Sequence, residues 1–310
     1  MKIVESYLKP ATPYLLMFPN FLPRDVNLLE HPDSISLARS IRRTGIGTLL
    51  DDKEIETAYV CLGKGSSPLL LLHGFDSSLL EYRHIYSLLA AQRETWAVDL
   101  LGFGFTARPN NLTYNPETIK EHLYCFWRKM INRPMVLVAS SMGGATAIDF
   151  AITYPQAVEK LVLMNSVGYS GSFYMGRLLF EPFDRIGVEF LRQRKIQALF
   201  WGKNLGLIDS KIEDVLRCAI LPSLMSNWEI AIKDFTRSGG YYDLEHKIHL
   251  VTQPTLILWG DRDDVLGTSA AVKFRRAIAN SRLIWLPEVG HTPHYEQPEV
   301  VARHILNFTM

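Results

Sequence analysis

Cysteine is scarce in this 310-residue sequence, and its three copies are far apart without a CxxC spacing: Cys61, Cys125 and Cys218. An odd number of widely separated cysteines argues against a disulfide framework and against a zinc site. Long apolar runs are also missing, since the stretch 14–18 lies between two prolines and is too short to cross a bilayer. These absences predict a cytoplasmic protein that is soluble or at most peripheral to a membrane.

A strong charge of either sign is lacking as well. The formal net charge is +1, and no run of lysine and arginine is long enough to form a patch for nucleic acid. Hydrophobic residues make up 47% and charged residues 21% of the chain, which is close to the average for globular proteins. The sequence therefore predicts a folded protein with a large core and no nucleic-acid partner.

Internal repeats and low-complexity tracts are absent, and most of the chain alternates short apolar runs with longer amphipathic segments. The segments 79–91, 116–131 and 143–153 have helical patterns. Strands are predicted at 56–62, 68–72, 95–99, 135–139, 161–164, 255–259 and 283–286. Almost continuously apolar strands separated by helices indicate an α/β fold with a mostly parallel sheet flanked by helices.

The alternation stops between about 172 and 251, where the pattern becomes helical and aromatic, and it resumes at Pro254. A helical block between two strands predicts an inserted cap or lid. Its aromatic residues suit either the lining of a site for a bulky apolar group or the cap's own core: Phe180, Phe183, Phe190, Phe200, Trp201, Trp228, Phe235, Tyr241 and Tyr242.

Residues 1–50 form a proline-rich N-terminal arm. Asp33 is the predicted N-cap of a short helix over 34–43, which carries Ile35, Ala38 and Ile41 on one face. We expect this face to pack on its own domain. Peripheral contact of the basic helix with an anionic membrane is the alternative.

Residues 135–147 read as a strand, an abrupt turn and a helix rich in small residues. In a nucleophile elbow, a serine occupies a strained turn and the residues two before and two after it must be small. Taking Ser141 as the nucleophile places Ala139 and Gly143 at these positions, whereas Ser140 would place Met142 at one of them. Sterics therefore favour Ser141 as the catalytic nucleophile.

A second segment, 70–76, follows an apolar strand and suits the turn that supplies another donor to a developing oxyanion. The N–H group of Phe75 is the candidate, paired with the N–H group of Met142. His73 precedes the nucleophile and is expected to be structural.

The carboxylate and the base of a catalytic triad are predicted after two later strands. The acid is expected after the later strand, because the earlier strand is followed by Asn165 rather than by an acid. The residues alone leave Asp261, Asp263 and Asp264 open as this acid. A charged, solvated loop without a catalytic role is the other interpretation of this segment. His291 is the predicted base, and the preceding Gly290 is expected to free the loop backbone so that the histidine can turn inward. His294 is the weaker candidate for the base.

The order serine, aspartate, histidine after successive strands resembles the α/β-hydrolase fold superfamily, in its serine-nucleophile branch with a helical cap. The resemblance runs from about residue 56 to the end and includes the D-x-x-G-x-G segment 99–104. It implies Asp263 as the acid, a core at 51–170 and 252–310, and a cap at 171–251. The chain also looks like cyanobacterial and plastid members, some relatives of which cleave the phytyl ester of chlorophyll-type pigments.

These observations together predict a serine esterase whose catalytic triad and oxyanion hole act on a small-molecule or lipid-like ester, without metal or organic cofactor. Two alternatives stay open. The same triad serves hydrolases that cleave carbon–carbon bonds in vinylogous diketones, although these commonly have Gly-Asn where this chain has Ala139-Ser140 and tryptophan where it has Thr292. A ligand-binding module that no longer turns over is the other alternative.

Overall fold

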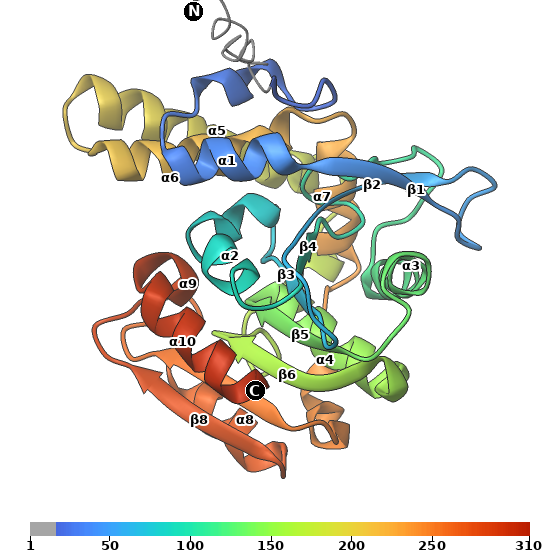
Figure 1. The fold of residues 1–310 in the computed structure, drawn as a ribbon. Coiled ribbons are helices and arrows are strands. Elements are labelled where there is room, and N and C mark those ends of the chain that lie inside the picture. Colours follow the sequence, from blue (N-terminus) through green and yellow to red (C-terminus); the bar gives the residue numbers. More distant parts are fainter. Residues whose placement is uncertain (1–16) are drawn as a thin grey trace, which may run out of the picture.

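A computed structural model describes residues 17–310, so most of the N-terminal apolar stretch 14–18 lies outside the described residues. A single eight-stranded sheet runs through the molecule in the order β1-β2-β4-β3-β5-β6-β7-β8 (Figure 1). Its strands are β1 Arg42–Ile46, β2 Ile55–Leu62, β3 Leu69–Leu72, β4 Thr95–Val98, β5 Met135–Ser140, β6 Val158–Met164, β7 Thr255–Gly260 and β8 Ser281–Leu286.

The directions of the strands confirm the predicted α/β class. β2 pairs antiparallel with both β1 and β4. All other neighbouring pairs, from β4–β3 to β7–β8, are parallel. Because parallel strands share one carboxyl edge, the loops after β3, β5, β7 and β8 meet at the same side of the sheet. These are the loops in which the sequence predicts the functional residues.

Helices cover both faces of the sheet, as expected for parallel strands. They are α1 Pro32–Ser40, α2 Arg83–Ala90, α3 Pro116–Met130, α4 Met142–Thr153, α5 Phe183–Asn204, α6 Ser210–Ile220, α7 Trp228–Arg237, α8 Ser269–Ala277, α9 Pro293–Glu296 and α10 Pro298–Thr309. On one face Leu70 and Leu72 of β3 share a core cluster with α3, α4 and α8. On the other, Leu69 and Leu71 share a cluster with α1, α2 and α10. β3 is therefore apolar at every position because it is buried on both sides.

The predicted end of the helix in the arm was wrong. Arg42 and Arg43 were expected to end the arm's helix, but α1 stops at Ser40 and both arginines belong to β1, which pairs with β2. The Arg43 side chain reaches across to donate to the carbonyl oxygen of Phe105 at 3.0 Å. Tertiary pairing thus extends a segment that its local pattern assigns to a helix, and the sheet begins before residue 51.

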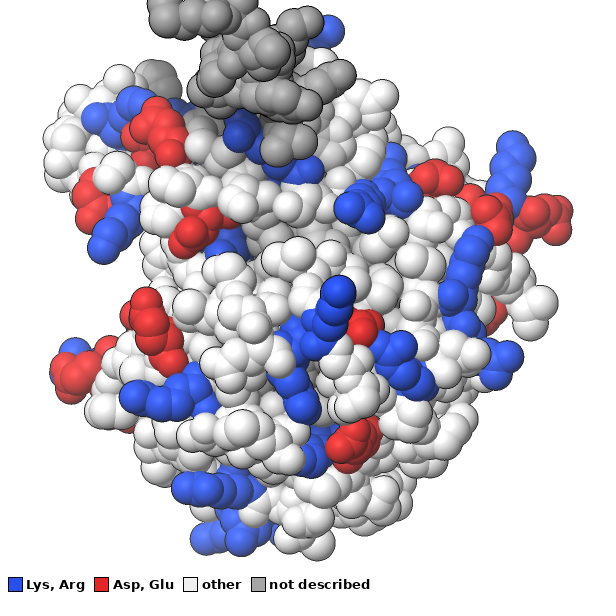
Figure 2. Space-filling model, in the orientation of Figure 1, with Lys and Arg blue, Asp and Glu red and all other residues white. Residues whose placement is uncertain are grey.

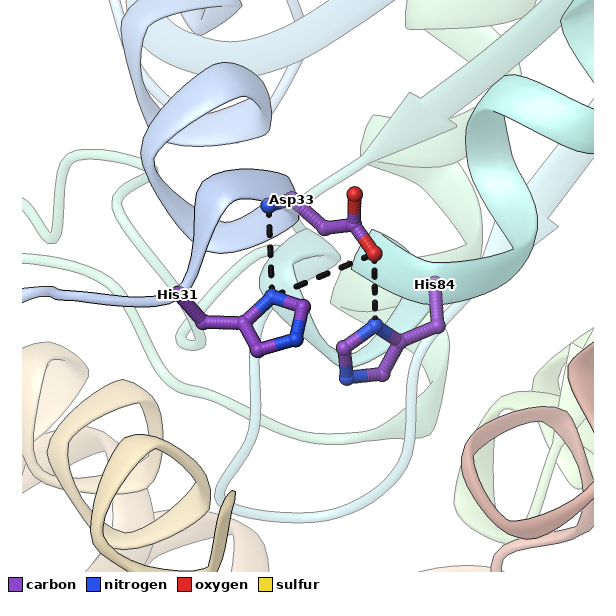
Figure 3. A group of neighbouring side chains, drawn as sticks. All are labelled: His31, Asp33 and His84. Atoms are coloured by element: carbon purple, nitrogen blue, oxygen red, sulfur yellow. Dashed lines mark hydrogen bonds and ion pairs between the residues drawn. The ribbon is translucent and has the colours of Figure 1, made fainter. Parts of the chain in front are cut away.

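The predicted N-cap of α1 was also wrong, because His31 occupies that position and its Nδ1 accepts the N–H of Asp33 at 3.3 Å. The Asp33 carboxylate instead meets Nδ1 of His84, on α2, at 2.8 Å (Figure 3). Ala38 and Ile41 are buried in the core, so this apolar face of the described arm packs on its own domain. The His31–Asp33–His84 cluster therefore joins the arm to α2.

The chain between β6 and β7 contains α5, α6 and α7, together with the short 3-10 helix η4 Tyr174–Leu178. In Figure 1, α5 and α6 lie at the top beside α1, and Ser34 of α1 donates to Asp214 of α6 at 2.6 Å. Within residues 17–310, no helix is both long and apolar enough to cross a membrane. Positive and negative side chains are interspersed on the face seen in Figure 2.

Candidate active site

Ser141 sits at the turn between β5 and α4, with a φ of 52° and a ψ of −121°. This left-handed φ is uncommon for a residue with a side chain and is tolerated where surrounding contacts enforce it. The backbone of Ser141 is held by its N–H, which donates to Met164, and by its carbonyl, which accepts from Val167, each at 3.0 Å. The sharp turn presents the hydroxyl above the carboxyl edge of the sheet.

Gly143 is required by a close approach between α4 and β3. A Cβ atom at this position would lie 2.1 Å from the carbonyl oxygen of Leu72 and 2.6 Å from that of His73. Both obstacles are backbone atoms of the central sheet, which cannot move aside easily. The small residue at this position therefore sets how closely the helix after Ser141 can approach the sheet.

We expect Gly143→Ala to lower the free energy of unfolding by about 3 kcal/mol, because the added methyl group overpacks a rigid backbone contact. Denaturant unfolding followed by circular dichroism measures this change. Gly187→Ala is the matched control, since no atom lies within 4 Å of the added carbon, and in helix α5 it should be neutral or stabilising. Equal stabilities of the two variants would contradict the steric argument.

The structure brings the three predicted triad residues together. Nε2 of His291 lies 3.1 Å from Oγ of Ser141, and Nδ1 of the same ring lies 3.1 Å from both carboxylate oxygens of Asp263. Asp263 follows β7 and His291 follows β8, so neighbouring parallel strands deliver both side chains to one edge. Asp261 and Asp264, the other two candidates for the acid, are exposed.

The electrostatic environment of Asp263 favours its ionised form. Burial acts to raise the pKa of this carboxyl, but hydrogen bonds from His291, the Leu266 N–H and Asn165 outweigh burial and hold the pKa below its usual value. The N–H groups of Val265 and Leu266 both donate to Oδ1, at 2.9 and 3.0 Å. The carboxylate therefore stays charged at neutral pH and can accept a hydrogen bond from the protonated Nδ1 of His291.

Asn165 is a buried residue of the site whose role the sequence did not reveal. Its amide nitrogen donates to Oδ2 of Asp263 at 2.7 Å and to the Gly290 carbonyl at 3.2 Å, while its oxygen accepts the Gly260 N–H at 3.2 Å. It thus ties the acid loop to the histidine loop. Its place at the end of β6, next to β7, is the only signal that the sequence offered.

Gly290 was expected to free the loop backbone so that His291 can turn inward, and the ring of His291 does face Ser141. Gly290 itself is not among the positive-φ glycines of the described chain; its N–H donates to Oε2 of Glu296 at 2.8 Å, and its carbonyl is bound by Asn165. A Cβ at Gly290 would lie 3.2 Å from the Glu296 carboxylate. Hydrogen bonds, rather than a left-handed φ, fix the loop before His291.

Both predicted oxyanion donors border the same cavity as the triad. Phe75 and Met142 line it together with Ser141 and His291, and its volume is about 470 Å³. Met142 is the first residue of α4, so its N–H has no acceptor one turn earlier within the helix. The neighbouring Gly74 N–H donates to Oε2 of Glu81 at 3.0 Å, which fixes the start of this loop.

The other histidines near the site have structural surroundings. His73 is fully buried between the Gly74 carbonyl and the Leu100 N–H, and burial lowers its pKa to about 4. Nε2 of His294 lies 3.4 Å from Oε1 of Glu81 rather than near Ser141. Burial raises the pKa of Glu81 to about 7 and lowers the pKa of His294 to about 3, so around pH 7 His294 is neutral and Glu81 is about half ionised.

One group in the described chain has the residue types and spacing of a metal site, and it lies away from Ser141: His31, Asp33 and His84 (Figure 3). The Nδ1 atoms that would face an ion already interact with Asp33, through its N–H for His31 and through its carboxylate for His84. The group is thus accounted for by the junction between α1 and α2.

Asp76 connects the loop of Phe75 to the helices between β6 and β7. Its carboxylate accepts from Nζ of Lys195, on α5, at 2.6 Å and from Nε1 of Trp228, on α7, at 2.9 Å. The side chain of Asp76 is 7% exposed and that of Lys195 12% exposed, so the ion pair is largely removed from water. Helices α5 and α7 are therefore anchored one residue away from a predicted oxyanion donor.

Asp76→Ala is expected to lower the free energy of unfolding by about 3 kcal/mol, because it leaves the ammonium group of Lys195 buried with backbone carbonyls but without an anionic partner. Lys195→Met should also destabilise the protein, because it leaves the carboxylate of Asp76 without its cationic partner. The double variant should be less destabilised than the sum of the two changes, which a double-mutant cycle in urea measures. Strict additivity would show that the pair is not coupled.

The fold and the site define a class of protein in which a serine on a strand-to-helix turn meets a histidine and an aspartate from later strands. A sequence model described as alpha/beta hydrolase fold matches residues 67–298. The chain therefore belongs to the α/β-hydrolase fold family and is a hydrolase of that fold.

The chain is similar in sequence or in structure to three proteins of known name. It is 33% identical over 300 residues to alpha/beta hydrolase domain-containing protein VTE7 of Arabidopsis thaliana, covering 94% of this chain and 90% of that protein. It is 30% identical to 2-hydroxy-6-oxo-6-(2'-aminophenyl)hexa-2,4-dienoic acid hydrolase of Metapseudomonas resinovorans, covering 82% and 87% of the two chains. A solved esterase from Thermogutta terrifontis superposes with a TM-score of 0.71 at 25% identity, covering 86% and 98%.

Proposed function

We propose that the protein hydrolyses a carboxylic ester through an acyl-enzyme on Ser141. The observation that carries this proposal is the continuous chain of contacts from Ser141 Oγ to His291 and on to Asp263, each at 3.1 Å. An ionised Asp263 favours the tautomer of His291 that has its proton on Nδ1. That tautomer leaves the lone pair of Nε2 directed at the serine hydroxyl.

The reaction has two balanced steps. His291 takes the proton of Ser141 as Oγ attacks the ester carbonyl, and the N–H groups of Phe75 and Met142 stabilise the oxyanion. His291 then gives this proton to the departing alcohol as the carbon–oxygen bond breaks. A water molecule, activated in the same way, attacks the acyl-enzyme and releases the carboxylic acid and the free serine.

The lining of the cavity favours an apolar acyl or alcohol group. Apart from the triad, its walls are mostly hydrophobic side chains from the core and from the cap: Phe75, Val167, Phe173, Phe235, Tyr241 and Leu266. Such a surface binds apolar substituents by removing them from water, and the few polar groups fix the reacting bond. We therefore place the physiological substrate among bulky, lipid-like esters.

The resemblance to cyanobacterial and plastid members, some relatives of which cleave the phytyl ester of chlorophyll-type pigments, is part of this proposal. It is supported by the 33% identity to the Arabidopsis protein over almost the whole chain. An ester of a long isoprenoid alcohol would also match the apolar cavity.

A second candidate is hydrolysis of a carbon–carbon bond in a vinylogous diketone. The named activity of the Metapseudomonas relative favours it, and the same serine and histidine could serve it. A panel of aryl esters of increasing acyl length, a phytyl ester and a 2-hydroxy-6-oxo-dienoate separates the two. We expect higher kcat/KM for the esters, and a preference for the dienoate would overturn the ester proposal.

A binding module without turnover is tested separately. A fluorophosphonate forms a covalent adduct only with an activated serine, so folded protein should gain one adduct on Ser141 detectable by mass spectrometry. An unlabelled serine in folded protein would favour the binding module.

A further inference from the structure

The cap segment 174–207 exposes an unusual amount of apolar surface. Of the 24 large hydrophobic side chains that are exposed in the described chain, twelve lie in this segment. They come from η4, from the link between η4 and α5, from α5 and from the turn after it: Tyr174, Met175, Leu178, Leu179, Phe180, Phe183, Ile186, Phe190, Phe200, Trp201, Leu205 and Leu207. Isolated exposed apolar residues are ordinary, but a concentration of this size indicates a surface that something covers.

Helix α5 leaves several of its large apolar side chains exposed to solvent. Phe183, Ile186 and Phe190, which recur at helical spacing, are 56%, 61% and 65% exposed. Its inward face carries Val188, which joins the core, and also buried charges, since Asp184 pairs with Arg237 at 3.3 Å and Lys195 pairs with Asp76. The ion pairs of this helix thus lie on its inner side, and its aromatic face is exposed to the solvent.

The aromatic residues of the cap were expected either to line the site or to form the core of the cap, and neither role accounts for these exposed rings. Phe235 and Tyr241 do line the cavity and Trp228 is buried in the cap, but the exposed rings of the segment do neither. Their contacts include pairs with one another, such as Phe180 with Phe183 at 5.3 Å and Phe200 with Trp201 at 5.1 Å. They are therefore available to an external apolar partner.

We propose that this outward face of residues 174–207 docks on the surface of a lipid bilayer that contains anionic lipid. The segment holds six lysine and arginine residues against three acidic ones, and without the inward-facing Lys195 and Asp184 it keeps five against two. Within residues 17–310, neither Arg177 nor Arg194 forms an ion pair with a carboxylate. Phenylalanine, tryptophan and leucine interleaved with cationic side chains are the composition of helices that lie in the interface of a membrane.

The position of the segment relative to the cavity adds a second argument, which rests on the proposed function. Arg194, on α5, lines the cavity that holds Ser141, so the docking face borders the entrance to the site. A bilayer against this face would present lipid-like esters to the cavity without their passage through water. Membrane contact was considered above for the helix of the arm, but the apolar face of that helix is buried. We therefore assign the contact to the cap.

Co-sedimentation of the full chain with vesicles tests the docking without any assay of activity. We expect binding to vesicles of phosphatidylcholine with phosphatidylglycerol and weaker binding to phosphatidylcholine alone or at high salt. The triple variant Phe183→Gln, Phe190→Gln and Trp201→Gln should weaken binding by about tenfold or more, since each change removes apolar area from the docking face. The single variant Phe190→Gln should show a smaller loss in the same direction.

The matched control is Leu49→Gln, Leu250→Gln and Trp285→Gln, which changes three exposed apolar residues outside the segment and should bind like the wild type. Hydrolysis of a water-soluble aryl ester and the melting temperature should be the same in all variants. If the wild type did not hydrolyse the aryl ester, that result would count against the proposed function and not against the docking. Failure of the wild type to bind vesicles, or equal binding by both triple variants, would overturn the docking. So would a wild-type dimer that the cap variant dissociates, since the face would then join two copies.

Discussion

Replacing Ser141 with alanine is expected to lower kcat for ester hydrolysis by about 10⁶-fold, the loss that follows when a triad loses its nucleophile. The reason is that no other hydroxyl lies within hydrogen-bonding reach of His291 Nε2 among the described residues. Initial rates with an aryl ester measure this effect, and mass spectrometry should show that the fluorophosphonate adduct is lost as well.

Ser140→Ala is the control for this experiment, since Ser140 is the neighbouring residue that sterics rejected as the nucleophile. It ends β5 with an extended backbone and does not contact His291. This variant should keep the adduct and most of the turnover. If it lost the adduct while Ser141→Ala retained it, the assignment of the nucleophile would have to be reversed.

Replacing Asp263 with asparagine is expected to lower kcat by about 10⁴-fold with little change in the fold. A neutral amide cannot stabilise the imidazolium that forms when His291 takes the proton. It can also donate to Nδ1 and so stabilise the wrong tautomer of the ring. Steady-state kinetics measure the loss, and the melting temperature serves to check the fold.

Asp264→Asn provides the matched change, because Asp264 is an exposed carboxylate in the same loop. It should retain nearly wild-type kcat. Asn165→Ala should fall between the two, since it removes one hydrogen bond to Asp263 and loosens the loop of His291 without removing the carboxylate. Comparable losses in Asp264→Asn and Asp263→Asn would show that the acid has been misassigned.

The architecture and much of the candidate site could be predicted from the sequence because their signals are local. Apolar strands alternate with amphipathic helices over most of the chain, and Ser141 lies in a strand, turn and helix whose small residues are visible in the sequence. Parallel strands then require that residues after β5, β7 and β8 meet at one edge. β1 escaped prediction because its pairing with β2, and not its own composition, makes it a strand.

The sequence by itself thus determined the fold class and the candidates Ser141 and His291, because periodicity and strand order are properties of neighbouring residues. The tertiary structure decided among the three aspartates that the residues alone left open, since Asp263, which the resemblance implied, meets the histidine and Asp261 and Asp264 do not. It alone also showed that Asp76 holds Trp228, 152 positions away, and that the aromatic face of α5 points outward. The physical reason is that helical spacing defines two faces of a helix, but only packing determines which of them is covered.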